Sequence, residues 1–260
     1  HIVKALAAQG ANLAIAARNE EALRTLAHQV REEHGVRVLA VATDVSHREQ
    51  MDALVQATLD EFDTIDILVN NAALERSELF SESDPDQTEM DLRVNVHAPM
   101  YLTRLVLPGM LQRDRGHIVN IASLAGLGAN AHGESYITTK HAVIGFTRAL
   151  RASMKAQGSS VSASSVCPGF VRDVGMFARK QAVNGVQAPG LLGSSRPETV
   201  AKTVIKAIRK DKAEVIVNPM PVRPLLVISL LWPSLGEWLM RVSGLNRVSD
   251  KMVEASRETP

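Results

Sequence analysis

The chain has 260 residues, one cysteine and a formal net charge of +1 at pH 7. Its length is enough for one α/β domain with a large core, because such folds often reach this size undivided. The near-neutral charge gives no electrostatic reason to expect a nucleic-acid partner. A single cysteine, Cys167, excludes an intrachain disulfide and favours a reducing compartment such as the cytoplasm.

The first nine residues read as a helix end with mixed polarity and not as a signal peptide. Asn19 and Ser46 are expected to cap the next two helices at their N-termini, and Gly35 to end the first of them. Strands are expected at 12–17, 36–45, 65–71, 117–122, 161–167 and 213–218. Helices are expected at 1–9, 19–33, 46–62, 86–113, 135–156 and 197–210. The stretch from 168 to 195 is expected to be irregular.

This alternation of strands and helices predicts an α/β fold with a doubly wound parallel sheet, Rossmann-like, in one domain over 1–218. Small or polar residues stand at the C-terminal ends of four of the strands or just after them: Asp44, Asn71, Ser123 and the pair Pro168-Gly169. Parallel strands end at one edge of their sheet. The pattern is therefore typical of the ligand crevice of an open parallel sheet.

The most informative local pattern is Tyr136 followed four residues later by Lys140, which places both on one helix face. A phenol is a poor base at neutral pH unless a nearby cation favours the phenolate, and Lys140 is such a cation. Taken alone the pair is weak, since this spacing occurs on many solvated helices. With Ser123 thirteen residues upstream it indicates a site that moves a proton between an alcohol and a carbonyl.

From its first residues to about Pro219 the chain resembles the classical short-chain dehydrogenase/reductase family. The resemblance rests on Asn70-Asn71-Ala72-Ala73, Asn95, Ser123, Tyr136, Lys140 and Pro168-Gly169. It implies that Tyr136 is the acid/base and that Lys140 lowers its pKa and binds the nicotinamide ribose. It also implies that Ser123 orients the substrate oxygen and that Asn95 holds a water between Lys140 and solvent.

The residues that would choose the cofactor follow the first expected strand. Ala17 and Arg18 stand where a carboxylate would favour NAD, so NADP is expected, with NAD as the alternative. By resemblance, Asp44 contacts the adenine edge, Val45 packs beside it, Asn71 lies near the adenosine ribose, and Pro168 and Gly169 lie beside the nicotinamide. Two departures weaken the expected nicotinamide placement: Ala73 replaces a glycine, and no threonine follows Gly169 closely.

The resemblance also implies a strand and a glycine-rich turn before residue 1, which the sequence does not contain. The chain is therefore expected to be N-terminally incomplete. Because that strand would be central, its two neighbours in the sheet are expected to lack a partner.

Residues 219–260 form a separate C-terminal extension, in which four prolines punctuate the apolar run 225–232. The run is too short to span a bilayer. Two interpretations stay open: a flap over the substrate site or a subunit contact, and an interfacial membrane anchor over 219–241.

The leading hypothesis is an NAD(P)-dependent oxidoreductase that interconverts a secondary alcohol and a carbonyl on a bulky apolar substrate. The expected pocket residues are Leu124, Leu127, Phe170, Met176, Phe177, Leu191 and Leu192. A catalytically silent nucleotide-binding regulator and a membrane-docked lipid-metabolising reductase are the alternatives. No histidine spacing predicts a metal site.

A homodimer or homotetramer is expected because the helices 86–113 and 135–156 carry more apolar residues than one sheet-facing stripe needs. These residues are Met90, Val94, Met100, Leu102, Leu105, Val106, Ile144, Phe146 and Leu150.

Overall fold

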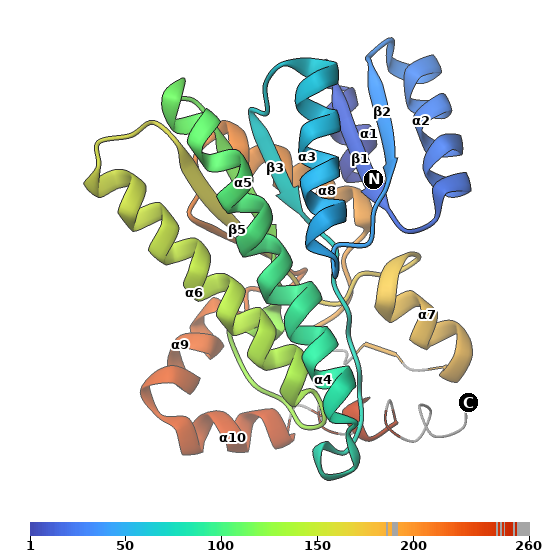
Figure 1. Ribbon diagram of the computed structural model, residues 1–260. Coiled ribbons are helices and arrows are strands. Elements are labelled where there is room, and N and C mark those ends of the chain that lie inside the picture. Colours follow the sequence, from blue (N-terminus) through green and yellow to red (C-terminus); the bar gives the residue numbers. More distant parts are fainter. Residues whose placement is uncertain are drawn as a thin grey trace.

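The computed structural model describes residues 1–185, 187–188, 192–242, 244, 246, 248–251 and 253. Its strands lie between two layers of helices, with α3, α5 and α6 in front of them and α1 and α8 behind in the view of Figure 1. All strand pairings are parallel, and helices connect successive strands, which confirms the predicted α/β class.

The strands form two sheets. The first contains β1 (Leu13–Ala17) and β2 (Val38–Ala42). The second has the order β3-β4-β5-β6, with the bounds Ile67–Asn70, His117–Ile121, Ser162–Pro168 and Glu214–Val217.

Within the part of the chain that the structure describes, β1 and β3 each pair along one edge only. Both strands line the same cavity, which residues 13–17 enclose from one side and residues 65–70 from the other. Two neighbouring strands without a partner between them are what the sequence predicted. The winding direction changes between β1 and β3, and this is where a doubly wound sheet forms its ligand crevice.

The helices before the middle of the chain are α1 (Ile2–Ala7), α2 (Glu20–His34), α3 (Arg48–Phe62), α4 (Pro85–Leu92) and α5 (Ala98–Gln112). Those that follow are α6 (Glu134–Ala156), α7 (Gly175–Asn184), α8 (Pro197–Arg209), α9 (Arg223–Leu231) and α10 (Pro233–Val242). A π-helical segment, η2 (Arg93–His97), joins α4 to α5, so that the helix expected at 86–113 is one helix with a π-bulge. Short 3-10 turns lie at Phe80–Glu82 (η1) and Leu124–Gly126 (η3).

Two of the three predicted caps are confirmed. Asn19 accepts a hydrogen bond from the Ala22 N–H (2.9 Å), and Gly35 adopts the left-handed conformation (φ 65°) that ends α2. The prediction for Ser46 is wrong, because α3 begins two residues later. The Ser46 hydroxyl instead donates to Asp44 Oδ1 (2.7 Å), so a local turn competes with the cap.

The prediction of an irregular stretch from 168 to 195 is also wrong, since α7 lies within it. No capping side chain marks the start of this helix. It is held by packing: Phe177 is buried, and its ring centroid lies 4.7 Å from that of Phe170. Tertiary contact therefore stabilises a helix that local sequence signals poorly.

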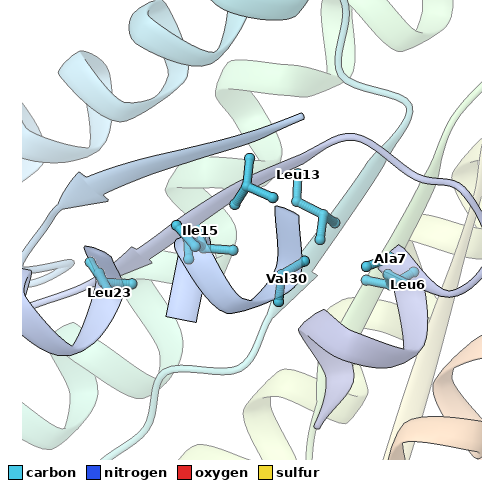
Figure 2. Close-up of a cluster of buried hydrophobic side chains, with 8 residues drawn as sticks. Leu6, Ala7, Leu13, Ile15, Leu23 and Val30 are labelled. Atoms are coloured by element: carbon cyan, nitrogen blue, oxygen red, sulfur yellow. The ribbon is translucent and has the colours of Figure 1, made fainter. Parts of the chain in front are cut away.

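Apolar clusters pack on both sheets. The cluster around β1, α1 and α2 has eight buried residues, and Val69 of β3 packs against it; Figure 2 labels Leu6, Ala7, Leu13, Ile15, Leu23 and Val30 in it. A second apolar cluster lies between the four-stranded sheet and the helices α5 and α6. It contains Met110, Ile118, Met154, Val161 and Ala163. Cys167 is fully buried beside Ile144, as expected for a packing residue.

Candidate active site

Three of the four predicted catalytic residues line one cavity of about 1590 Å³. Ser123 follows β4 and begins the turn η3, while Tyr136 and Lys140 lie one turn apart on α6. The helix spacing therefore places their side chains on the same face, toward the end of the strand that carries Ser123.

Lys140 is buried next to the Tyr136 ring. Its Nζ lies 5.5 Å from the ring centroid and donates a hydrogen bond to the carbonyl oxygen of Ile121 (3.0 Å). Burial lowers the pKa of Lys140 to about 8, although the charges of Glu75 and Cys167 act in the opposite direction. The ammonium is thus a cation held in a low-dielectric site, close to where a phenolate would form.

The pKa of Tyr136 lies well above its ordinary value, mainly because burial disfavours the phenolate and secondarily because of the charge of Glu75. A hydrogen bond with the Ser123 side chain acts the other way. The resemblance implies a lowered pKa, whereas burial outweighs the other influences here. At neutral pH Tyr136 is consequently a protonated phenol, which can donate a proton to a substrate oxygen.

Asn95 lies on the π-helical segment η2 and is buried. Its amide Nδ2 donates to the Leu74 carbonyl oxygen (2.8 Å) and to Thr139 Oγ1 (3.0 Å), and its Oδ1 accepts from the Leu74 N–H (2.7 Å). The Thr139 hydroxyl in turn donates to the carbonyl oxygen of Tyr136 (2.8 Å). Asn95 thus ties the loop after β3 to the helix turn that carries Tyr136, and its role toward a water stays a prediction.

A chain of buried amides below the site was not predicted. Asn70 Nδ2 donates to Asn120 Oδ1 (2.8 Å), and Asn120 Nδ2 donates to Thr147 Oγ1 (2.8 Å). Thr147 completes the chain by donating to the Val143 carbonyl oxygen (2.7 Å). These bonds fix β3, β4 and α6 relative to one another. The available signal was Asn120 itself, a polar residue inside an otherwise apolar strand.

Glu75 was also missed. It is half-buried, lines the cavity, and raises the pKa of both Tyr136 and Lys140. Its sequence signal is only its position shortly after the polar end of β3. A carboxylate here favours the protonated form of both catalytic groups.

The residues predicted to bind the nucleotide lie at the opposite end of the same cavity. Arg18 is exposed just after β1, Asp44 and Val45 follow β2, and Asn71 follows β3. Burial alone would raise the pKa of Asp44, but hydrogen bonds from Ser46 and the charge of Arg18 outweigh it and lower the pKa. Asp44 is therefore ionised at neutral pH and close enough to Arg18 for their charges to interact.

Pro168 ends β5 and Gly169 follows it, both lining the cavity. A Cβ atom at Gly169 would lie 2.5 Å from Asn218 Oδ1 and 3.0 Å from Leu124 Cδ1, so a larger residue here would have to displace these side chains. The lining of this one cavity thus includes Arg18, Asn71, Lys140 and Gly169. These residues fit a nicotinamide dinucleotide.

The substrate end of the cavity is largely apolar. Five of the seven predicted residues line it: Leu124, Phe170, Met176, Phe177 and Leu192. The prediction for Leu127 is wrong, because its side chain packs in the core against Ala122, Val143, Ile144 and Cys167. Leu191 lies outside the residues that the structure describes.

The C-terminal extension supplies further walls. Val222, Leu225, Leu226 and Val248 line the cavity. The extension also returns to the loop before α6: Asn130 Nδ2 donates to Ser249 Oγ (3.0 Å), and His132 Nε2 lies 2.9 Å from Asp250 Oδ1. Contacts this distant in sequence carry no local signal.

No group of three or more histidine, cysteine, aspartate or glutamate side chains in the described ranges could hold a metal ion. His117 lies at the start of β4, where its Nε2 is 2.8 Å from Ser164 Oγ. In the same ranges, no helix has the length and apolar character needed to cross a bilayer.

Comparison with known proteins places this chain in a family. Residues 1–184 match the family model of the short chain dehydrogenases. The ketoacyl reductase HetN of a Nostoc species is 34% identical over 259 residues, which cover 98% of this chain and 88% of the relative. D-beta-hydroxybutyrate dehydrogenase of Cupriavidus necator is 34% identical over 170 residues, or 65% of each chain.

Solved structures agree. A short-chain dehydrogenase/reductase of Burkholderia phymatum in complex with NAD has a TM-score of 0.77 and 27% identity, covering 90% of each chain. Actinorhodin polyketide ketoreductase with NADPH has a TM-score of 0.72 and 28% identity, covering 83% of this chain and 89% of the other. The fold and the relatives together define an oxidoreductase that uses a nicotinamide cofactor and a small-molecule substrate. The chain belongs to the short-chain dehydrogenase family.

Proposed function

We propose that this enzyme reduces the carbonyl group of a bulky apolar compound, or oxidises the corresponding secondary alcohol, with Tyr136 as the acid/base. The observation that carries the proposal is a protonated phenol beside Ser123 and Lys140 at the apolar end of the cavity. A nicotinamide cofactor, when bound, supplies the hydride for reduction or accepts it for oxidation.

The protein side of the reaction is the movement of one proton. In the direction of reduction, Tyr136 donates its phenolic proton to the carbonyl oxygen, and Ser123 donates a hydrogen bond that orients that oxygen. The buried Lys140 ammonium then stabilises the phenolate that remains. Oxidation would run through the reverse transfer, with the Tyr136 phenolate as the base, a form that burial disfavours at neutral pH.

NADP is the proposed cofactor, with NAD as the alternative. Arg18 is exposed at the nucleotide end of the cavity, and its guanidinium can bind a 2′-phosphate through two hydrogen bonds. The neighbouring Asp44 carboxylate is already engaged by two hydrogen bonds from Ser46 (2.9 and 2.7 Å). Similar structures contain either NADPH or NAD.

A bulky apolar substrate is proposed because the walls near Tyr136 come mainly from aliphatic and aromatic side chains. Two similar proteins carry names that point the same way, a ketoacyl reductase and a polyketide ketoreductase. L-Sorbose reductase of Gluconobacter frateurii, solved with NADPH and L-sorbose, has a TM-score of 0.74 and 25% identity over 85% of this chain and 91% of the other. A sugar is therefore the substrate class with which apolar ketones should be compared.

The test is a turnover screen with NADPH and ketones of graded size and polarity, monitored by loss of NADPH. Apolar ketones should be reduced with kcat/KM at least about ten-fold above that for a ketose, as expected when an apolar pocket accepts several more methylenes. A preference for the ketose would contradict the substrate class. NADPH binding without turnover of any ketone would favour a catalytically silent nucleotide-binding regulator.

We also propose a homodimer or homotetramer of a cytoplasmic protein, with α5 and α6 at the contact. The apolar face available for it is smaller than the sequence suggested, because Val94, Leu102, Val106 and Ile144 are buried within one chain. Met100 (45% exposed) and the half-buried Met90, Leu105, Phe146 and Leu150 remain. Light scattering that returned a monomer at micromolar concentration would overturn this assembly.

A further inference from the structure

The hairpin formed by α9 and α10 (223–242) carries most of the exposed apolar surface. Of the twelve large hydrophobic residues found exposed in the described ranges, eight lie between 220 and 242. They are Met220, Val227, Leu230, Leu231, Trp232, Leu235, Trp238 and Val242. The two helices meet at the lower left edge of the molecule in Figure 1, with Trp232 between them. A patch of this kind on a folded protein marks an interaction site.

The tip of this hairpin has the composition of a membrane-interface element. Leu230 is 82% exposed and Trp232 59%, and Leu231 between them is also exposed. The chain has only two tryptophans, and both Trp232 and Trp238 lie exposed on the hairpin. Tryptophan is enriched at the boundary between lipid headgroups and acyl chains, where one end of the ring is apolar and the other is hydrated.

Positive charge lies behind the tip. Arg223, at the start of α9, is eight residues before Leu231, which corresponds to about 12 Å of helix. Arg223 and Arg148 share a single carboxylate, that of Glu214, at 3.4 and 2.7 Å. Two guanidiniums on one carboxylate leave a net positive cluster. An interfacial helix inserts its apolar face by ~5–10 Å, so this cluster would meet the lipid phosphates.

The opposite face of α9 is a wall of the substrate cavity. Val222, Leu225 and Leu226 line the cavity that also contains Tyr136. Leu226 packs closely on the loop before α6, since a Cβ atom at Gly128 would lie 3.3 Å from Leu226 Cδ2. One short helix therefore separates the apolar cavity from the exposed apolar tip.

We propose that the α9–α10 hairpin docks on an anionic lipid surface and admits apolar carbonyl compounds from the bilayer to the cavity. The substrate part rests on the function proposed above, whereas the docking part does not. A second copy of the chain fits the surface less well. An isologous contact needs a self-complementary patch, and this one combines an exposed apolar tip with the arginine cluster of Arg148 and Arg223, against which the hairpin sets one exposed carboxylate, Glu237. Such a profile complements apolar chains beneath negative headgroups.

Docking can be read directly from the two tryptophans. Vesicles of phosphatidylcholine with phosphatidylglycerol should co-sediment the chain and shift its tryptophan emission to shorter wavelength. Vesicles of phosphatidylcholine alone should do so more weakly, because they lack the negative charge that the arginines recognise. Absence of both effects would overturn the proposal. So would a shift that needs no lipid and grows with protein concentration, because it would show a second copy on the hairpin.

A matched pair of variants locates the contact. The double substitution Leu230→Glu with Leu231→Glu should weaken vesicle binding by at least about ten-fold, since it removes two inserted apolar side chains. Phe80→Glu changes a residue of nearly the same exposure as Trp232, 58%, on the turn η1 outside the hairpin, and should leave vesicle binding unchanged. Unaltered circular dichroism and NADPH affinity would show that both variants fold. Equal binding by the two variants would refute the assignment to the tip.

The access step is tested by comparing a water-soluble ketone with a long-chain ketone dissolved in the vesicles. The double variant should lose at least about ten-fold in kcat/KM for the embedded ketone and little for the soluble one, because only the former depends on docking. Equal rates for wild type and variant on the embedded ketone would refute access while leaving docking intact. Turnover of no ketone at all, with vesicle binding retained, would instead refute the proposed reaction.

Discussion

The two sheets hold the two ends of the cavity in different ways. In the β3–β6 sheet, the groups around the candidate chemistry are buried and cross-linked over long sequence distances, as in the bond from Asn70 to Asn120. In the β1–β2 sheet, Arg18 is exposed and Asp44 is bound by its near neighbour Ser46. Proton transfer needs groups fixed in a low dielectric, whereas a phosphate is bound by exposed charges. The same kind of substitution should therefore act differently in the two regions.

The largest effect is expected from Tyr136→Phe in the β3–β6 region. The substitution removes the proton donor and little volume, so kcat for ketone reduction should fall by ~10²–10⁴-fold. NADPH affinity, measured by fluorescence titration, should stay within about two-fold, because the nucleotide end of the cavity is unchanged. Activity within a few-fold of wild type would remove Tyr136 from the proposed mechanism.

The second largest effect is expected from breaking the buried amide chain. Asn120→Ala leaves Asn70 Nδ2 without its acceptor and Thr147 Oγ1 without its donor, and should lower the free energy of unfolding by about 2–3 kcal/mol in urea. Ser46→Ala in the β1–β2 region is the control. It breaks a part-exposed bond within one turn, so its cost should stay below about 1 kcal/mol. Equal losses in free energy of unfolding for the two variants would contradict the proposed difference between the two regions.

This difference also decides what the sequence could predict. Ser123, Tyr136 and Lys140 were accessible because a helix turn and a strand end bring them together by local geometry. The parallel sheet followed from the alternation of elements. By contrast, the partners of Asn120 are 50 and 27 residues away, and those of Asn130 and His132 lie 119 and 118 residues away. Helix α7 depends on the packing of Phe177. Such pairings exist only after folding: Asn120 is visible in the sequence as a polar residue in an apolar strand, but its partners are not.

In the β1–β2 region, Arg18→Ala should change affinity without changing stability much. Loss of a charge-assisted hydrogen bond, worth about 1.5–3 kcal/mol, should weaken NADPH binding by about 10–100-fold. NADH lacks the 2′-phosphate, so its affinity should change by less than about three-fold. Titration of both cofactors against wild type and variant gives the ratio. An equal loss for NADPH and NADH would make Arg18 a surface residue without a part in cofactor choice.

The smallest predicted effect concerns the charge buried at Lys140. Its pKa is about 8 in the folded chain, whereas the ordinary value of 10.5 applies to the unfolded chain. Between these two pH values the unfolded state binds more protons than the folded state. The buried Lys140 charge therefore lowers the free energy of unfolding by its full amount below about pH 8, and by less as the pH rises toward 10.5.

Lys140→Met removes that charge and keeps the length of the side chain. The variant should be inactive yet more stable than wild type at pH 7. In urea unfolding, the difference in free energy of unfolding between variant and wild type should be smaller by about 1–2 kcal/mol near pH 9.5 than at pH 7. Arg18→Ala is the control, because an exposed guanidinium carries no comparable burial cost, and its difference from wild type should be the same at both pH values. A Lys140→Met variant that is less stable than wild type at pH 7 would mean that the bond to Ile121 outweighs the cost of burial. The two regions would then differ in geometry, but the buried charge of Lys140 would carry no net cost in free energy of unfolding.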